Sequence, residues 1–131
     1  MSDLDRTLLD LAAAAAELAY TPYSHFRVGA AVVTDSGEVF SGANIENAAY
    51  GACVCAETNA ITTAAAAGTR RIEVVAVVCL DGDLCTPCGN CRQVMREFGV
   101  KRVVMRTAEG EPRSVPLEGL LPESFGPEAL G

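Results

Sequence analysis

Arg71-Ile-Glu-Val-Val-Ala-Val-Val-Cys-Leu80 is the plainest strand in the sequence. Its apolar residues follow one another without polar alternation, which predicts a strand that is buried on both faces of a sheet. A helix is predicted on either side of it, over Cys55–Ala67 and over Cys88–Phe98, and a further strand over Val100–Thr107. Strands that alternate with helices in this way are typical of a sheet covered by helices on both faces.

The residues before and after this unit add a helix and three strands. A helix is predicted over Leu4–Tyr20, because apolar residues recur at helical intervals and Pro22 follows. Phe26–Val33 and Glu38–Ser41 are predicted as a hairpin, and Ser114–Pro116 as a short last strand. The expected fold is an α/β, three-layer α/β/α sandwich with a mixed five-stranded sheet, in a single domain of residues 1–131.

Composition and charge exclude several classes of protein. The 131 residues include 17 acidic and 10 basic side chains, for a net charge of −7, and Lys101 is the only lysine. Proteins that bind nucleic acid show basic stripes, which are missing here, so no nucleic-acid partner is expected. The apolar runs are shorter than the roughly 20 residues of a bilayer span, and residues 1–20 lack the pattern of a secretory signal. The expectation is a soluble cytoplasmic protein with no membrane partner.

Six cysteines require an explanation other than disulfides in such a compartment. Two segments contain three of them, Cys55-Ala-Glu57 and Pro87-Cys-Gly-Asn-Cys91, each where a loop becomes a helix. Cys88 and Cys91 are three residues apart and can share one face of a first helical turn, and Cys55 can add a third thiolate. Helix N-termini favour thiolates, and three thiolates leave the fourth position of a tetrahedral zinc ion open for water.

Other interpretations of these residues remain open at this point. A lone C-x-x-C pair also occurs in redox proteins and in structural zinc sites, and Cys85 makes a second such pair with Cys88. Cys85 is interpreted as a spare thiol on the loop, and Cys53 and Cys79 as small buried hydrophobes. Glu57 can complement the helix dipole or, beside an open zinc position, carry protons.

Five segments of the chain resemble the homotetrameric, three-cysteine cytidine deaminases. The resemblance covers nearly the whole chain, and its segments occur in the family's order and spacing. They are Tyr23–Ala31, Gly42–Tyr50, Cys55–Glu57, Pro87–Gly99 and Leu120–Pro127.

The resemblance implies an enzyme with one Zn²⁺ per subunit, held by Cys55, Cys88 and Cys91, and with Glu57 as its catalytic residue. Zinc-bound hydroxide would attack C4 of cytidine or 2′-deoxycytidine while Glu57 protonates N3 and then the departing amino group. The products would be ammonia and uridine or 2′-deoxyuridine, a reaction of pyrimidine salvage.

The resemblance also implies the residues that bind the nucleoside. Asn44 and Glu46 match a pair that hydrogen-bonds the ribose, and Phe26 matches a ring that lines the sugar and base pocket. Ala48, Tyr50 and Phe125 match positions that reach a neighbouring subunit's site, with Phe125 stacking on the base. Ala56 belongs to the same substrate-binding set. Sites shared between chains imply a homotetramer.

One position departs from the family. Many members carry an arginine that hydrogen-bonds two zinc thiolates where this sequence has Thr58. The hypothesis is that Thr58 shifts the pH optimum or substrate range, with Arg92 supplying some of the compensating charge. A specialised aminopyrimidine-nucleoside deaminase resembling blasticidin S deaminase therefore remains an alternative. A noncatalytic zinc-binding module is another, and it would need Cys85 as a fourth ligand.

Overall fold

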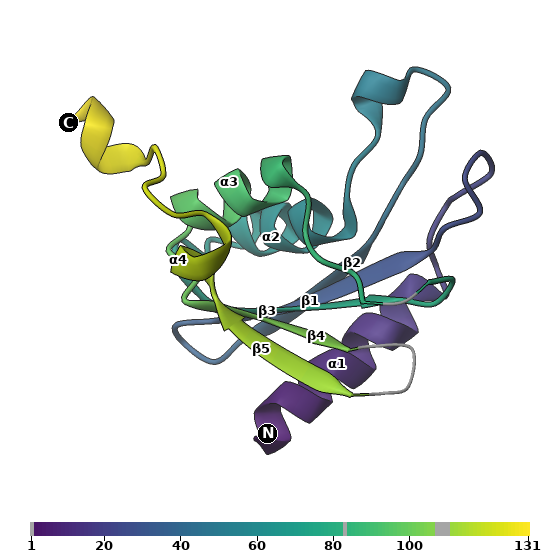
Figure 1. The fold of residues 1–131 in the computed structure, drawn as a ribbon, viewed down its shortest axis with the longest axis horizontal. Helices are drawn as coiled ribbons and strands as arrows, with labels where there is room; N and C mark the ends of the chain where they lie inside the picture. Colours follow the sequence, from purple (N-terminus) through teal and green to yellow (C-terminus); the bar gives the residue numbers. More distant parts are fainter. Residues whose placement is uncertain (1, 83, 107–110) are drawn as a thin grey trace.

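Five strands form one mixed sheet in the order β2-β1-β3-β4-β5 (Figure 1). The computed structural model describes residues 2–82, 84–106 and 111–131. β3 runs parallel to β4, whereas the other neighbouring strands are antiparallel. The strands are β1 (Val28–Thr34), β2 (Val39–Ala43), β3 (Ile72–Cys79), β4 (Arg102–Arg106) and β5 (Pro112–Pro116). The α-helices are α1 (Asp3–Ala16), α2 (Ala56–Ala66), α3 (Gly89–Glu97) and α4 (Leu117–Leu120), and short 3₁₀ helices cover Tyr50–Ala52 and Pro127–Leu130.

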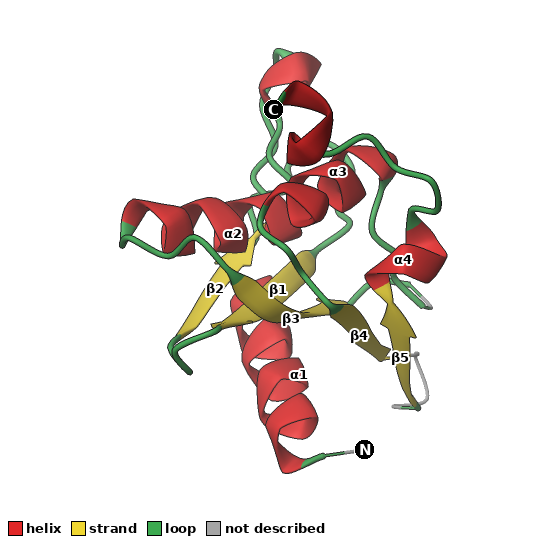
Figure 2. Cartoon of the chain, turned by 90° about the vertical axis from the view of Figure 1, so that its left-hand side faces the viewer, coloured by secondary structure: helices red, strands yellow, loops and turns green. Residues whose placement is uncertain are grey.

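Helices cover both faces of the sheet. α1 lies on one face, and α2 and α3 lie on the other (Figure 2). Along β3, Val74 and Val78 pack on the α1 side, while Val75 and Val77 pack in the cluster that contains α2 and α3 residues. The predicted burial of β3 on both faces is confirmed, as is the three-layer α/β/α fold with its mixed five-stranded sheet. Within the described part of the chain, no helix combines the length and apolar character needed to cross a membrane.

Two glycines allow helix backbones to approach the sheet closely. A Cβ on Gly29 of β1 would lie 1.9 Å from the carbonyl oxygen of Ala12 in α1. A Cβ on Gly42 of β2 would lie 2.6 Å from the backbone nitrogen of Ala60 in α2. Both distances are below any normal contact, so each helix position depends on the missing side chain.

Some element boundaries differ from the predicted ones. α1 ends at Ala16 rather than at Tyr20, because the Tyr20 amide donates to the Asn44 carbonyl at 3.0 Å and draws the chain away from the helix axis. β1 begins at Val28 rather than at Phe26, whose amide donates to the Ser24 hydroxyl instead of to a strand. The end of the predicted strand at Thr107 lies outside the described residues.

Candidate metal centre and active site

The N-terminal ends of α2 and α3 bring three cysteines together. Cys55 is the N-cap residue of α2, and Cys88 is the N-cap residue of α3. The Cys88 sulfur accepts a hydrogen bond from the Cys91 amide at 3.4 Å, so it satisfies one of the free N–H groups of the first turn. The same contact holds Cys88 and Cys91 on one side of the helix end.

The three sulfur atoms have the spacing of a zinc site. They lie within 4.8 Å of one another, and the Cys55 and Cys88 sulfurs are 3.8 Å apart. Tetrahedral coordination with Zn–S bonds of about 2.3 Å separates the sulfurs by about 3.8 Å. Cys85 does not belong to this cluster, which is the only group of three or more potential ligands found among the described residues. The donor set therefore fits a zinc ion with three protein ligands and one open position.

The surroundings of Cys91 show why a cation suits the cluster. Its hydrogen bond with Cys55, then burial and the charge of Glu57, raise the pKa of the Cys91 thiol, whereas the Thr58 hydroxyl lowers it. The Thr58 oxygen lies 3.3 Å from the Cys91 sulfur. A dication between the sulfurs would stabilise all three thiolates and so lower the pKa of Cys91 instead of raising it.

Arg92, expected to offset the thiolate charge, makes other contacts. Its Nε donates to the carbonyl of Pro87 at 2.8 Å, and its Nη1 donates to the carbonyl of Leu120 at 2.8 Å. The side chain thus braces the loop before Cys88. Besides the Cys91 amide, which bonds the Cys88 sulfur, the hydroxyl of Thr58 contacts the cluster at the Cys91 sulfur.

Glu57 lies in the first turn of α2, two residues after Cys55, and only 4% of it is exposed. Burial raises the pKa of its carboxyl group, against a smaller lowering by a backbone hydrogen bond. A raised pKa makes a carboxyl a stronger proton acceptor than an ordinary glutamate, which suits a group that takes up and returns protons. It faces a pocket of about 150 Å³ whose lining residues are Val28, Asn44, Cys55, Ala56, Glu57, Cys85, Thr86 and Cys88.

Three of these lining residues were not predicted as site residues. Val28 projects from the start of β1, and Cys85 and Thr86 come from the loop before α3. The thiol of Cys85 is half-buried, and burial, followed by Cys79 and Glu57, raises its pKa. The only sequence feature that pointed to Cys85 was its Cys85-x-x-Cys88 spacing. That spacing predicted either a metal ligand or a spare thiol, and not an uncharged thiol that lines the pocket of Glu57.

The other cysteines divide between buried and exposed. Cys79 is buried at the end of β3, as predicted. The interpretation of Cys53 as a buried hydrophobe is wrong, because this residue is exposed in the loop before α2. Its sulfur accepts a hydrogen bond from the Asn47 amide at 3.3 Å. The loop is therefore held by polar contacts of the thiol rather than by its burial.

Asn44 links the pocket to the segment before β1. Its Oδ1 accepts from the Val28 amide at 2.9 Å, and its Nδ2 donates to the Phe26 carbonyl at 2.9 Å. These bonds hold the backbone on both sides of Arg27 at the pocket rim. Phe26 itself is 40% exposed, and its ring lies against Gly82, where a Cβ would come within 2.8 Å of it.

Glu46 organises the turn in front of Phe26. Its carboxylate accepts from the Tyr23 and Ser24 amides at 3.0 and 3.1 Å, and also from the Ser24 hydroxyl. The Ser24 hydroxyl, followed by the backbone amides, lowers the pKa of Glu46, so it is ionised at neutral pH. His25, between Ser24 and Phe26 in this turn, has a positive φ of 57°.

Of the seven predicted substrate residues, Asn44 and Ala56 line the pocket of Glu57, while Glu46 and Tyr50 line a second pocket of about 280 Å³. Three members of the set, Tyr50 among them, are the ones expected to reach a neighbouring subunit's site. Ala48 is exposed, Tyr50 is 76% exposed and Phe125 is 61% exposed. Tyr50 makes an edge contact with Tyr23 at a ring separation of 6.3 Å. Phe125 belongs to the C-terminal segment, which extends beyond α4 (Figure 1). None of the three lines the pocket of Glu57.

Known proteins share this sequence and this fold. Residues 2–107 match the family described as the cytidine and deoxycytidylate deaminase zinc-binding region. The chain belongs to this deaminase family. A cytidine deaminase of Halalkalibacterium halodurans is 41% identical over 130 residues, which make up 97% of this chain and 98% of that protein. A cytidine deaminase of Mycobacterium tuberculosis is 39% identical over 131 residues, covering 99% and 96% of the two chains.

Solved structures of the deaminases agree with the fold. The crystal structure of cytidine deaminase from Burkholderia pseudomallei has a TM-score of 0.85 at 46% identity, covering 95% of this chain and all of that one. A deoxycytidylate (dCMP) deaminase from the cyanophage S-TIM5 has a TM-score of 0.58 at 21% identity, which shows the shared fold alone. The family membership and the sulfur cluster together confirm the expectations of a hydrolase and of a zinc cofactor.

Proposed function

We propose that this protein is a zinc-dependent deaminase that converts cytidine and 2′-deoxycytidine into uridine and 2′-deoxyuridine with release of ammonia. The observation that carries the proposal is the buried carboxyl of Glu57 in one pocket with the sulfurs of Cys55 and Cys88. Cytidine deaminases about 40% identical over nearly the full length support the choice of substrate.

The zinc ligands are proposed to be Cys55, Cys88 and Cys91, with Glu57 as the proton carrier. Bound zinc supplies the Lewis acidity that makes water nucleophilic at neutral pH. In the reaction a C–O bond forms at C4 of the base and the C4–N bond breaks. Glu57 takes one proton from the water and places it on N3. It then takes the second proton from the new hydroxyl at C4 and passes it to the departing amino group, so the two protons of the water end on N3 and on ammonia. The raised pKa of its carboxyl supports both directions of transfer.

The nucleoside is proposed to contact Phe26, Asn44, Glu46 and Ala56 of the same chain. Asn44 and Ala56 line the pocket of Glu57, which supports contact with the base or sugar. Glu46 is ionised, and a carboxylate is a strong acceptor for a ribose hydroxyl. Phe26 offers an exposed ring beside the pocket rim.

A homotetramer with shared active sites is proposed from three predicted substrate residues that do not line the pocket of Glu57 in their own chain. Tyr50 and Phe125 expose aromatic rings, and Ala48 is exposed in the same loop as Tyr50. Leu18 is 80% exposed beside an apolar groove of about 400 Å³ between α1, β2 and α2. Apolar surface of this kind is typical of a face that another chain covers. We further propose that residues 1–131 act as one domain, in the cytoplasm and in pyrimidine salvage.

The test is an absorbance assay of the zinc-loaded protein with cytidine, beside Glu57→Gln and the matched variant Glu38→Gln. Glu38 is an exposed carboxylate in the β1–β2 turn, away from the pocket. Wild type and Glu38→Gln should form uridine and ammonia, while Glu57→Gln should lose about 100-fold or more in kcat. No turnover of cytidine, with zinc bound and the fold intact, would refute the proposal. Turnover of blasticidin S in its place would assign the specialised deaminase.

A further inference from the structure

Helix α3, which with its N-cap residue contributes two sulfurs to the metal cluster, also holds the C-terminal segment, residues 119–131. At its N-terminal end Arg92 donates to the carbonyl of Pro87, just before Cys88, and also to the carbonyl of Leu120. One residue further along, Gln93 Nε2 donates to the carbonyl of Phe125 at 2.9 Å. Two side chains of α3 thus fix the backbone of this segment at places five residues apart in sequence.

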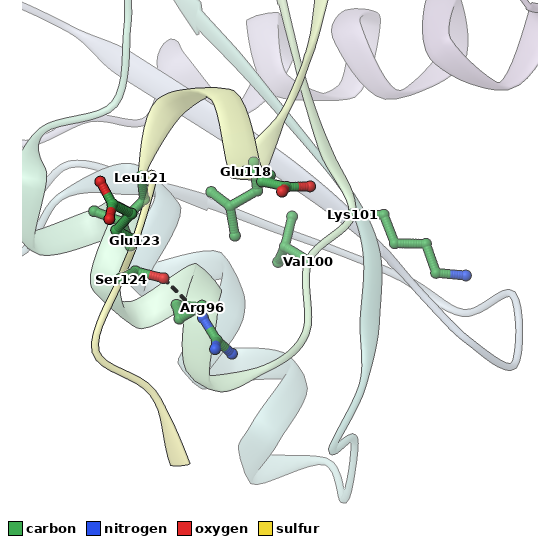
Figure 3. A pocket seen from close by; sticks show the side chains of 8 residues that line it. Arg96, Val100, Lys101, Glu118, Leu121, Glu123 and Ser124 are labelled. Atoms are coloured by element: carbon green, nitrogen blue, oxygen red, sulfur yellow. Dashed lines mark hydrogen bonds between the residues drawn. The ribbon is translucent and has the colours of Figure 1, made fainter. Parts of the chain in front are cut away.

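Arg96, one turn later, adds two further contacts to this segment. Its Nε donates to the Ser124 hydroxyl at 2.9 Å (Figure 3). Its Nη2 pairs with the carboxylate of Glu128. A Cβ on Gly126 would lie 2.6 Å from the guanidinium carbon, so the chain passes directly over the Arg96 side chain. Arg96, Ser124 and Glu123 also line a hollow of about 480 Å³ between the helix and the segment.

The ring of Phe125 is mostly exposed, while the backbone that carries it is hydrogen-bonded to α3. Phe125 is 61% exposed, whereas the carbonyl of the same residue and the hydroxyl of Ser124 are both bonded to α3. The position of this ring is therefore set through the backbone. A backbone fixed on both sides of an exposed aromatic residue presents the ring to something outside its own chain at a small cost in conformational entropy.

We propose that Gln93 and Arg96 are positioning residues, which hold Phe125 where it stacks on the nucleoside bound in a neighbouring subunit. The inference rests on the proposed function, because it takes the base as the partner of Phe125. Neither side chain lines the pocket of Glu57, so both act through the segment that they hold. Loss of either should weaken substrate binding more than it slows the chemical step, since the metal ligands and Glu57 keep their places.

A purely structural role predicts a different result. Contacts that serve stability alone would lower the melting temperature and the amount of active enzyme, and they would leave KM unchanged. A positioning role raises KM in the properly folded, zinc-loaded fraction. Hydrogen exchange of the segment's amides reports on its ordering without any turnover.

The experiment uses the full-length, zinc-loaded protein with Gln93→Leu, Arg96→Met and the control Glu97→Gln. Glu97 is an exposed α3 residue outside these contacts. Zinc content, cytidine kinetics and deuterium uptake over residues 119–131 are measured for each. We expect KM to rise about fivefold for Gln93→Leu and about tenfold or more for Arg96→Met, with kcat changed less than about threefold. Deuterium uptake of the segment should rise in both variants and stay at the wild-type level in Glu97→Gln.

Two controls separate the possible failures. If Arg96→Met does not fold, Ser124→Ala removes the same hydrogen bond from the other side and should give the same signature in KM and exchange. An unchanged KM, or unchanged exchange over residues 119–131, would overturn the proposal. A wild-type protein that does not deaminate cytidine would refute the proposed function, and with it the role assigned to Phe125. The exchange data would still decide whether the two side chains hold the segment.

Discussion

Replacing Gly42 with alanine should weaken zinc binding without touching the metal cluster. The new Cβ would lie 2.6 Å from the Ala60 nitrogen and 3.0 Å from the Asn59 carbonyl carbon, both in the backbone of α2. Backbone atoms cannot rotate away, so α2 must retreat from β2 by roughly 0.8 Å to regain an ordinary contact distance. Cys55 is the N-cap of α2 and moves with it, whereas Cys88 belongs to α3.

The size of the effect follows from the tolerance of the site. Ligand distances in zinc sites hold to about ±0.2 Å, so a shift of this size at Cys55 exceeds what the cluster can absorb. We expect the zinc dissociation constant to rise about 10- to 100-fold. Overpacking should also lower the free energy of unfolding by about 1–3 kcal/mol. For a chain of this length, each 1 kcal/mol lowers the melting temperature by about 4 °C.

Gly29→Ala provides the matched comparison on the opposite face. Its Cβ would lie 1.9 Å from the Ala12 oxygen and 2.5 Å from the Ala16 nitrogen, so α1 must retreat further than α2 does. The loss of stability should reach about 3 kcal/mol or more, while the zinc affinity of the folded protein stays within about threefold of wild type. Gly119→Ala is the neutral control, since its Cβ would meet only the Val115 side chain at 3.7 Å.

Zinc affinity is measured by competition with a chromophoric chelator, and stability by urea unfolding at a fixed chelator concentration. The chelator is in excess, so that every variant is zinc-free, because at one free zinc concentration a variant with a raised zinc Kd would gain less stability than wild type. The reasoning is refuted if Gly42→Ala is destabilised and yet binds zinc as tightly as wild type. In that case the contact between α2 and β2 does not set the geometry of the cluster.

Three further predictions concern Thr58, Asp5 and the proposed zinc ligands. Thr58→Val keeps the shape of Thr58 but removes the hydroxyl 3.3 Å from the Cys91 sulfur, so zinc affinity should fall about 10- to 100-fold. The control is Thr62→Val, which removes a hydroxyl that bonds the α2 backbone. Equal zinc affinities in the two variants would contradict the role of Thr58. Asp5→Asn should cost about 1–3 kcal/mol at pH 7, because the Asp5 carboxylate is 7% exposed and accepts two hydrogen bonds from Arg102 at 2.8 and 2.9 Å. These bonds hold the pKa of Asp5 below its ordinary value of 3.8. Its contribution to the free energy of unfolding is therefore present above pH 3.8 and is lost as the pH falls through the folded-state pKa. Urea unfolding from pH 7 to pH 2 should show this loss of stability in wild type and a flatter pH dependence of stability in Asp5→Asn. Chelation of zinc should expose Cys55 and Cys88 to iodoacetamide, and Cys91 should be labelled more slowly because it is buried. If mass spectrometry finds Cys55 and Cys88 labelled equally with and without zinc, they are excluded as ligands.

The elements of the sheet could be predicted because each depends on a local pattern. The uninterrupted apolar run of β3 requires two buried faces, and the structure places α1 against one and α2 with α3 against the other. Cys55 and Cys88 were predicted near helix starts, and the structure makes both of them N-cap residues. Caps and strand periods are both short-range properties, because a cap depends on hydrogen bonds within the first helical turn and a strand period on the alternation of successive side chains.

Contacts between distant segments could not be predicted in this way. The 3.8 Å between the Cys55 and Cys88 sulfurs spans 33 residues of sequence, and it depends on how closely α2 approaches β2 at Gly42. The same limit explains the error at Cys53, whose loop is held by Asn47 rather than by burial. It also explains why Cys85 was not predicted to line the pocket of Glu57.

Local periodicity and capping therefore specified which residues form helices and strands, and which cysteines stand at helix ends. The packing of α2 and α3 on the sheet set the distance between the sulfurs, the burial of Glu57 and the attachment of the Phe125 segment to α3. The physical reason is the range of the interactions. Helix and cap hydrogen bonds and side-chain periods act over a few residues, whereas close packing is a property of the whole core, in which a single Cβ at Gly42 would displace a helix.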